Sequence, residues 1–276
     1  MNSVKKSRGL KVFVSVFFVL TFVINCLRLE IWADDLFPAR SEDPEEMVLI
    51  SEAAINIFLY DKYSEYDDVV ITDVIYHNPL DTYNFNQTML NMFYNSRSDK
   101  HYDYDIEGSC SEVAIAIVNE YMLRKGIVSW DGNANDKDSI FYRICGAAKD
   151  NGWDGKTGTP ENIIDDIFTD AMDYYTPKYK GDYSTLFMHQ KYMDSYYAGI
   201  PVIVTIPDHS VCGVGILEKN VTYTKTGLFG IETTETELET FLIVNNGWLN
   251  MEVGTQGRYS YVSFEYVTSI VVPVPK

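Results

Sequence analysis

A cysteine, a histidine and an asparagine are placed along this chain where they could form a thiol-dependent active site. Cys110 opens an apolar segment, His209 begins a β-branched one, and Asn246 follows the apolar run at 241–244. A thiolate can attack a carbonyl carbon, an imidazole can take and return a proton, and an amide can hold that imidazole in one orientation. These residue types therefore indicate nucleophilic catalysis, with Cys110 as nucleophile, His209 as base and Asn246 as the orienting group.

The segment around Cys110 is predicted to be the start of a buried helix. Ser109 and Glu112 precede the apolar run 113–122 with the spacing of a capping box. Cys110 then lies in the first turn, where unpaired N–H groups and the positive end of the helix dipole favour a thiolate. Apolar residues occur on more than one face, which indicates a central helix. The alternative is that Cys110 is only a small buried hydrophobic residue.

His209 stands where a turn leads into a strand. A predicted strand at 199–206 ends at Pro207 and Asp208, which turn the chain, and the next strand begins at His209. Gly213 and Gly215 are expected to leave room beside the histidine. None of the other three histidines has such a setting, although a histidine on a strand is also often structural.

Asn246 follows a predicted buried strand and precedes Gly247 and Trp248. An asparagine there can fix the tautomer of the histidine ring, as a carboxylate does in serine triads. Trp248 would shield that hydrogen bond from water. The alternative interpretation is an ordinary Asn-Gly turn between two strands.

In this order the three segments resemble the papain-like cysteine peptidases, and most closely their compact bacterial C39-like branch, which includes many secreted proteins. Gly108-Ser109-Cys110 matches the Gly-Ser-Cys of the family, and Glu120 lies on the same helix, where papain relatives often carry a glutamate. Residues 244–248 resemble the hydrophobic-x-Asn-Ser-Trp motif, and residues 199–204 resemble the C39-like segment that leads to the histidine. The resemblance covers residues 100–276.

The resemblance implies an α+β papain-like fold, in which an N-terminal nucleophile helix packs on an antiparallel β-sheet. It implies hydrolysis of peptide or amide bonds by a triad of Cys110, His209 and Asn246 through a thioester, with a peptide or protein as substrate and no cofactor or metal.

Three features depart from the family pattern. Tyr104 occupies the position of the glutamine that completes the oxyanion hole, so its hydroxyl is the candidate second donor beside the Cys110 N–H. Ser111 replaces a tryptophan, and residues 219–239 are expected to form an extra hairpin or loop. These departures keep two alternatives open: an inactive surface binding protein on the same fold, and a transglutaminase-like acyltransferase.

The N-terminal residues have the pattern of an export signal. Four basic residues between positions 5 and 11 precede an apolar run at 12–24. This pattern favours a secretory signal peptide that comprises residues 1–33. A retained membrane anchor is the alternative. Residues 34–100 are expected to form an N-terminal extension, as a propeptide or as part of the fold, and residues 101–276 the peptidase domain. The predicted location is secreted or at the cell surface.

The composition fits a soluble exported domain. The chain has 276 residues with 22 Lys+Arg and 40 Asp+Glu; taking away the five basic and one acidic residues of 1–33 leaves 17 and 39, a net charge of −22. Such a charge argues against nucleic acid and anionic lipid as partners. The cysteines beyond residue 33 are Cys110, Cys145 and Cys212, an odd number that excludes a complete disulfide framework. Cys145 and Cys212 either pair or remain free thiols.

The remaining segments are predicted to be scaffold. We expect a helix from Pro44 to Tyr60, a strand at 69–76, a helix after Thr159-Pro160, and a helix that opens at Asp182 or Ser184 and ends at Gly199. Residues 131–136 are rich in side-chain oxygens, but Asp136 replaces the glycine that an EF-hand requires. We therefore interpret them as a polar turn.

Overall fold

The computed structural model describes residues 49–83, 108–130, 140–155, 157–247 and 259–276. The predicted signal segment 1–33, Tyr104, the polar turn at 131–136 and Trp248 lie outside these residues. All described residues belong to the second of two compact units, which begins at Val48. Within the described part, no helix is both long enough and apolar enough to cross a membrane.

A seven-stranded sheet forms the centre of the described part, and its strand pairs are antiparallel. Its strands run in the order β4-β9-β5-β6-β7-β8, and β1 pairs with β6 off this path. The strands are β1 (Asp67–His77), β4 (Tyr179–Ser184), β5 (Val202–Ile206), β6 (His209–Thr226), β7 (Glu232–Asn245), β8 (Ser260–Ser263) and β9 (Ser269–Pro275).

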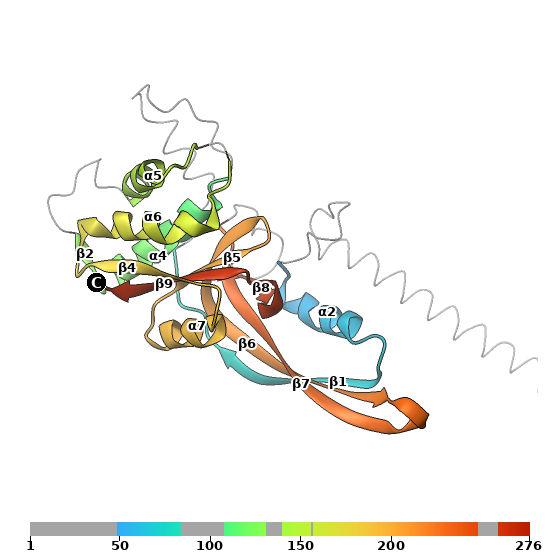
Figure 1. The fold of residues 1–276 in the computed structure, drawn as a ribbon. Helices are drawn as coiled ribbons and strands as arrows, with labels where there is room; N and C mark the ends of the chain where they lie inside the picture. Colours follow the sequence, from blue (N-terminus) through green and yellow to red (C-terminus); the bar gives the residue numbers. More distant parts are fainter. Residues whose placement is uncertain (1–48, 84–107, 131–139, 156, 248–258) are drawn as a thin grey trace, which may run out of the picture. The chain divides into compact units, whose positions relative to one another are not determined.

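Helices lie on both sides of this sheet (Figure 1), with α4, α5 and α6 on one side and α7 on the other. The helices are α2 (Ile55–Lys62), α4 (Cys110–Arg124), α5 (Ile140–Asp150), α6 (Ile164–Ala171) and α7 (Met188–Tyr197). A two-stranded sheet pairs β2 (Ser129–Trp130) with β3 (Tyr175–Thr176). Short 3-10 helices occupy Glu52–Ala54, Glu161–Ile163, Met172–Tyr174, Leu228–Gly230 and Phe264–Tyr266. The architecture is therefore α+β, as expected from the sequence.

The predicted nucleophile helix is central. In α4, every residue from Ser111 to Asn119 is buried, together with Tyr121 and Met122. The helix contacts β5 and β6 on one side and α5 on the other. A helix that is apolar on several faces can be stable only when several neighbours cover it, and this placement confirms the expectation of a central helix packed on an antiparallel sheet.

The turn before His209 is formed as predicted. β5 is buried along its whole length, Asp208 adopts a left-handed φ of 55°, and β6 returns with His209 opposite Ile206. An aspartate tolerates this conformation better than most residues, because its short polar side chain can bond locally. His209 is therefore placed at a tight hairpin corner.

Gly213 and Gly215 of β6 make room for residues other than His209. A Cβ on Gly213 would lie 2.5 Å from a ring carbon of Tyr192 in α7, and one on Gly215 would lie 2.9 Å from the backbone oxygen of His77 at the end of β1. The expectation that they leave room beside the histidine was wrong. They let α7 and the β1 segment approach the sheet closely.

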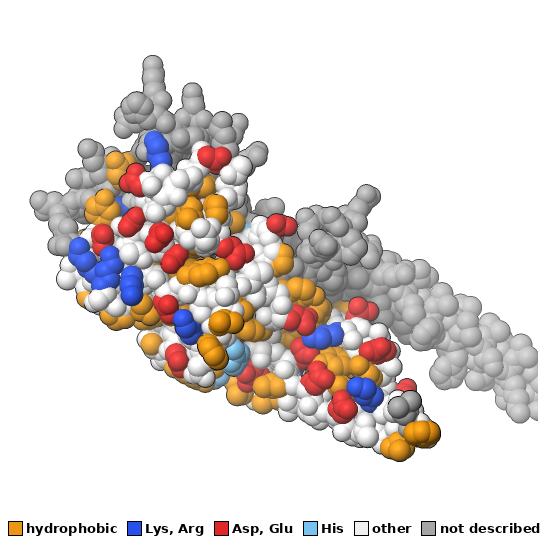
Figure 2. All heavy atoms as spheres, in the orientation of Figure 1, with side chains coloured by type: hydrophobic (Ala, Val, Ile, Leu, Met, Phe, Trp, Pro, Cys, Tyr) orange, Lys and Arg blue, Asp and Glu red, His pale blue; other side chains and the backbone are white. Residues whose placement is uncertain are grey.

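The predicted insertion at 219–239 is a long hairpin. β6 and β7 pair continuously from Cys212 opposite Asn245 to Thr226 opposite Glu232, apart from one irregularity at Gly213–Gly215. β1 lines part of the other edge of β6, so the three strands form a ribbon that extends beyond the helices (Figure 1). Figure 2 shows apolar side chains at its tip, where Phe229 is 98% and Ile231 62% exposed.

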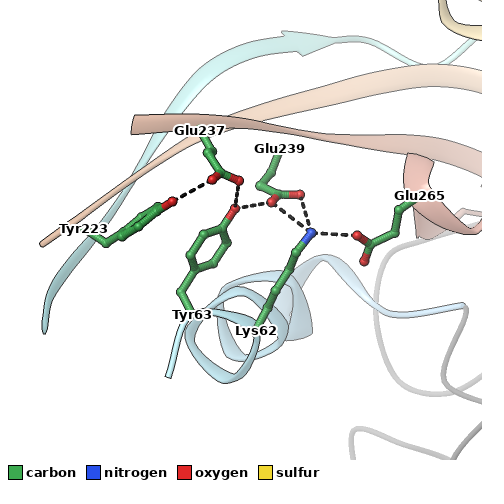
Figure 3. A network of polar contacts seen from close by, with 6 residues as sticks. All are labelled: Lys62, Tyr63, Tyr223, Glu237, Glu239 and Glu265. Atoms are coloured by element: carbon green, nitrogen blue, oxygen red, sulfur yellow. Dashed lines mark hydrogen bonds and ion pairs between the residues drawn. The ribbon is translucent and has the colours of Figure 1, made fainter. Parts of the chain in front are cut away.

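A polar network ties α2 to this ribbon (Figure 3). The Tyr63 hydroxyl lies within hydrogen-bond distance of Glu237, at 2.8 Å, and of Glu239, while Tyr223 donates to Glu237 at 2.6 Å. Lys62 pairs with Glu239 at 3.0 Å and with Glu265 at 2.7 Å. Opposite charges and donors thereby compensate a row of glutamates along one face of β7.

Two predicted elements differ in extent. Residues 179–184 form β4, on the edge of the sheet beside β9, so the helix expected from Asp182 or Ser184 begins only at Met188. Pairing with β9 has overridden the local helix signal. The first described helix is Ile55–Lys62, preceded by a 3-10 turn at Glu52–Ala54, and the part of the expected helix before residue 49 lies outside the described residues.

Candidate active site

Cys110 is the first residue of α4 and is partly exposed, whereas most of the helix behind it is buried. Gly108, two residues earlier, has a φ of 71°, and a Cβ there would lie 2.6 Å from the backbone nitrogen of Gly158. The backbone just before the helix therefore lies in close contact with the backbone of residues 157–158. As the first helical residue, Cys110 has a backbone N–H with no acceptor inside the helix, so this N–H can serve an oxyanion.

Two serine residues direct hydrogen-bond donors at the sulfur of Cys110. The backbone N–H of Ser210 and both the N–H and the hydroxyl of Ser111 interact with it, and each lowers its pKa. Ser210 is the residue next to His209 in β6. The structure thus brings the start of the nucleophile helix into contact with the start of the histidine strand.

The two elements are also joined through side chains. Ser111 Oγ and Ser210 Oγ lie 2.9 Å apart, and both residues are buried. The Ser111 hydroxyl has a defined role here, because it links α4 to β6 directly beside Cys110.

His209 is held by the backbone of Asn246. Its Nε2 lies 3.0 Å from the backbone oxygen of Asn246. A carbonyl oxygen can only accept a hydrogen bond, so Nε2 carries the proton, and in the neutral ring Nδ1 has the free electron pair. The contact therefore selects the tautomer in which Nδ1 can accept a proton.

The side chain of Asn246 has another bond. Its amide nitrogen donates to Ser260 Oγ at 3.1 Å, across the end of β8. The adjacent Asn245 is fully buried; its amide nitrogen donates to Thr82 Oγ1 at 3.3 Å, and its Oδ1 accepts from Gly247 N at 3.2 Å. Asn246 was expected to orient His209 through its amide; the structure shows that the backbone oxygen of Asn246 also holds the ring, through Nε2.

The predicted capping box at the start of α4 does not form. Ser109 has φ −92° and ψ 20° instead of the extended backbone of an N-cap, and no side-chain cap bond is made. Its buried hydroxyl has no partner among the described residues. Glu112 instead accepts a hydrogen bond from Thr159 Oγ1 at 2.6 Å. The tertiary contact has displaced the local one, and sequence spacing carries no signal for it.

Both proposed catalytic groups favour their neutral forms. Burial raises the pKa of the Cys110 thiol, with a further rise from the nearby Glu112 carboxylate, and these effects outweigh the surrounding donors. Burial also lowers the pKa of His209, although its bond to Asn246 acts in the opposite direction. The start of the helix was expected to favour a thiolate at Cys110; burial acts in the opposite direction, since desolvation disfavours the charged form.

The other described cysteines are buried free thiols. Cys145 lies in α5 and Cys212 in β6, and neither forms a disulfide. Burial raises the pKa of both thiols. Over the described ranges, no group of three or more His, Cys, Asp or Glu side chains is arranged to hold a metal ion.

Comparisons with known proteins add little to this geometry. A scan against models of protein families and a search of curated proteins found no match. Among solved structures, the chain is similar to the crystal structure of UfSP from C. elegans, with a TM-score of 0.43 and 8% sequence identity. The match covers 75% of this chain and 38% of that one. A similarity at this level does not bear on function. The fold and the site themselves define an α+β protein with a cysteine and a histidine at a junction between a helix and a strand.

Proposed function

We propose that this protein is a cysteine peptidase of papain-like fold that hydrolyses peptide or amide bonds, with Cys110 as nucleophile and His209 as general base. The observation that supports this most is the junction of α4 and β6. There Ser210 N–H contacts the Cys110 sulfur, while the neighbouring His209 is held with Nδ1 unprotonated.

The proposed reaction starts from a neutral pair, because burial disfavours both the thiolate and the imidazolium. As the sulfur bonds to the substrate carbonyl carbon, its proton passes to His209 Nδ1. The negative charge that forms on the carbonyl oxygen is stabilised by the Cys110 N–H, with Tyr104 as the proposed second donor. His209 then returns the proton to the leaving amine, and a thioester remains.

Water completes the reaction. His209 takes a proton from the water as it attacks the thioester carbon, the carbon–sulfur bond breaks, and the thiol regains its proton. Throughout this sequence the Asn246 carbonyl keeps Nε2 protonated, so the ring exchanges protons through Nδ1 alone. Asn246 would thus act as a positioning residue.

Export is part of the proposal. The basic and apolar pattern of residues 1–33 supports a signal peptide or membrane anchor, and the peptidase would act on peptides or proteins outside the cell.

An inactive binding protein on the same fold is the rival function. The directions of the Cys110 and His209 pKa shifts favour it, since a thiol with a raised pKa is a poor nucleophile at neutral pH. The two functions differ in whether His209 promotes reaction at Cys110.

Alkylation of the full chain tests this difference. Iodoacetamide labelling at pH 7 and pH 8 is followed by mass spectrometry, with the buried Cys145 and Cys212 as internal references. The peptidase proposal expects selective labelling of Cys110 that slows about tenfold in His209→Ala, corresponding to about 1.4 kcal/mol of assistance. Labelling that His209→Ala leaves unchanged would support the binding protein.

Hydrolysis is the direct test. A quenched-fluorescence peptide library is incubated with wild type, Cys110→Ala and His209→Ala. Loss of a positioned general base costs about 10²–10⁴ in rate, so His209→Ala should retain at most about 1% of wild-type turnover and Cys110→Ala none. Equal turnover in all three proteins would show that this site is not responsible.

A further inference from the structure

A carboxyl group is buried in the first turn of the helix that begins with the proposed nucleophile. Glu112 is 0% exposed, two residues after Cys110 in the first turn of α4. One oxygen, Oε1, accepts from Thr159 Oγ1 at 2.6 Å, while Oε2 has no partner within the described part of the chain. A buried carboxylate with one oxygen unsatisfied is costly, whereas the protonated acid is much less so.

The contact with Thr159 belongs to a tight junction. Residues 157–158 lie against Gly108, which precedes Cys110 in the sequence, and Thr159 donates a hydrogen bond to Glu112, which follows it. The Thr159 hydroxyl thus links this segment to the start of the helix, and the charge of Glu112, two residues after Cys110, acts on the thiol through space.

We propose that Glu112 is a positioning residue that controls the ionisation of Cys110: as a neutral acid it permits the thiolate, as a carboxylate it opposes it, and Thr159 sets the balance between the two forms. The consequence of this control for catalysis rests on the proposed function.

The geometry also sets the directions of the pKa shifts of the two groups. Burial raises the pKa of Glu112 to about 7, and the Thr159 hydrogen bond acts against that rise. Ionised Glu112 in turn raises the pKa of Cys110. As pH increases through about 7, Glu112 loses its proton, and the thiolate at Cys110 becomes harder to form than it would be beside a neutral residue.

Among the described residues, the elements packed against α4 carry several titratable groups, including the exposed Tyr142, Lys149 and Asp150 of α5 and, farther along β6, Glu218 and Lys219. β5 has no titratable side chain, and the first residues of β6 bring His209 and Cys212, whose buried neutral forms are favoured. α5 brings Cys145 and Arg143, and the Arg143 guanidinium lies 4.7 Å from the ring centre of Trp130 and 3.8 Å from that of Tyr174.

The pH dependence of Cys110 alkylation in the full chain tests the proposal without any substrate. Glu112→Gln keeps an acceptor for Thr159 and removes the charge. We expect the ratio of its labelling rate to that of wild type to be near one at pH 5.5 and about tenfold at pH 8.5, because a neighbouring like charge shifts a pKa by about one unit. A ratio that is the same at every pH would overturn the proposal, since a purely structural change has no such profile.

Thr159→Val provides the second test. Without the hydrogen bond Glu112 should remain protonated to higher pH, so at pH 7.5 this variant should react faster than wild type, while adding it to Glu112→Gln should give no further increase. An equal acceleration in both backgrounds would contradict the proposal. If labelling of Cys145 or Cys212 shows that Glu112→Gln is misfolded, the Thr159→Val profile decides. A pH-dependent ratio in a protein without hydrolytic activity would refute the peptidase proposal alone.

Discussion

Ser111 Oγ and Ser210 Oγ lie 2.9 Å apart in the interior, and this hydrogen bond joins the helix that begins at Cys110 to the strand that begins at His209. Ser111 is 1% and Ser210 4% exposed. This contact therefore helps to couple the positions of the two residues to which we assign the chemistry.

Removing one hydroxyl should leave the other buried without that partner. We expect Ser111→Ala to lower the free energy of unfolding by about 1–3 kcal/mol, the usual cost of a buried polar group that loses its bond. Urea unfolding measures this. The control is Ser111→Ala with Ser210→Ala, which should cost less than the sum of the two single changes, since the double variant leaves no orphaned hydroxyl. Additive costs would mean that the hydroxyls do not interact.

Gly108 should resist substitution more than another glycine of similar backbone conformation. Gly108→Ala introduces a Cβ 2.6 Å from Gly158 N, whereas Gly152→Ala, at φ 95°, has no atom within 4 Å of its new Cβ. Both changes carry the positive-φ cost of about 1–2 kcal/mol, and Gly108→Ala should cost at least about 1 kcal/mol more from overpacking. Thermal unfolding compares the stabilities of the two variants. Equal losses of stability would show that residues 157–158 can move away from the new Cβ at no cost.

Changing the side chain of Asn246 should affect Cys110 less than removing His209. The bond to His209 Nε2 comes from the Asn246 backbone, which Asn246→Ala retains. We therefore expect the alkylation rate of Cys110 in Asn246→Ala to fall by less than about threefold, which corresponds to less than about 0.7 kcal/mol. The expected fall for His209→Ala is about tenfold. A fall as large as that of His209→Ala would instead assign the orienting role to the side-chain amide.

The network at Glu237 should contribute to stability in a pH-dependent way. Hydrogen bonds from Tyr223 and then Tyr63 lower the pKa of Glu237. A carboxyl with a depressed folded-state pKa stabilises the fold above its unfolded pKa, and this contribution is lost as pH falls through the folded value. Tyr223→Phe should therefore destabilise the protein more at pH 7 than at pH 3 in urea unfolding. In a Glu237→Gln background the pH dependence of this difference should disappear; its persistence would place the cause elsewhere.

Local sequence signals predicted the elements around the site well. The Pro207-Asp208 turn placed the start of a strand at His209, and the apolar run after Cys110 placed a central helix. Both signals act over a few residues, through turn chemistry and side-chain periodicity. The same local reasoning failed at residues 182–184, where pairing with β9 makes a strand of a segment expected to begin a helix.

The sequence by itself determined the class of fold, the insertion between His209 and Asn246, and the order of the three candidate residues. Only the tertiary structure decided that Glu112 bonds Thr159, 47 positions away, that the Asn246 backbone holds His209, and that burial favours the neutral thiol. The physical reason is that desolvation and long-range hydrogen bonds depend on which surfaces pack together. Backbone propensities and spacing act over one or two turns, so they cannot specify those partners.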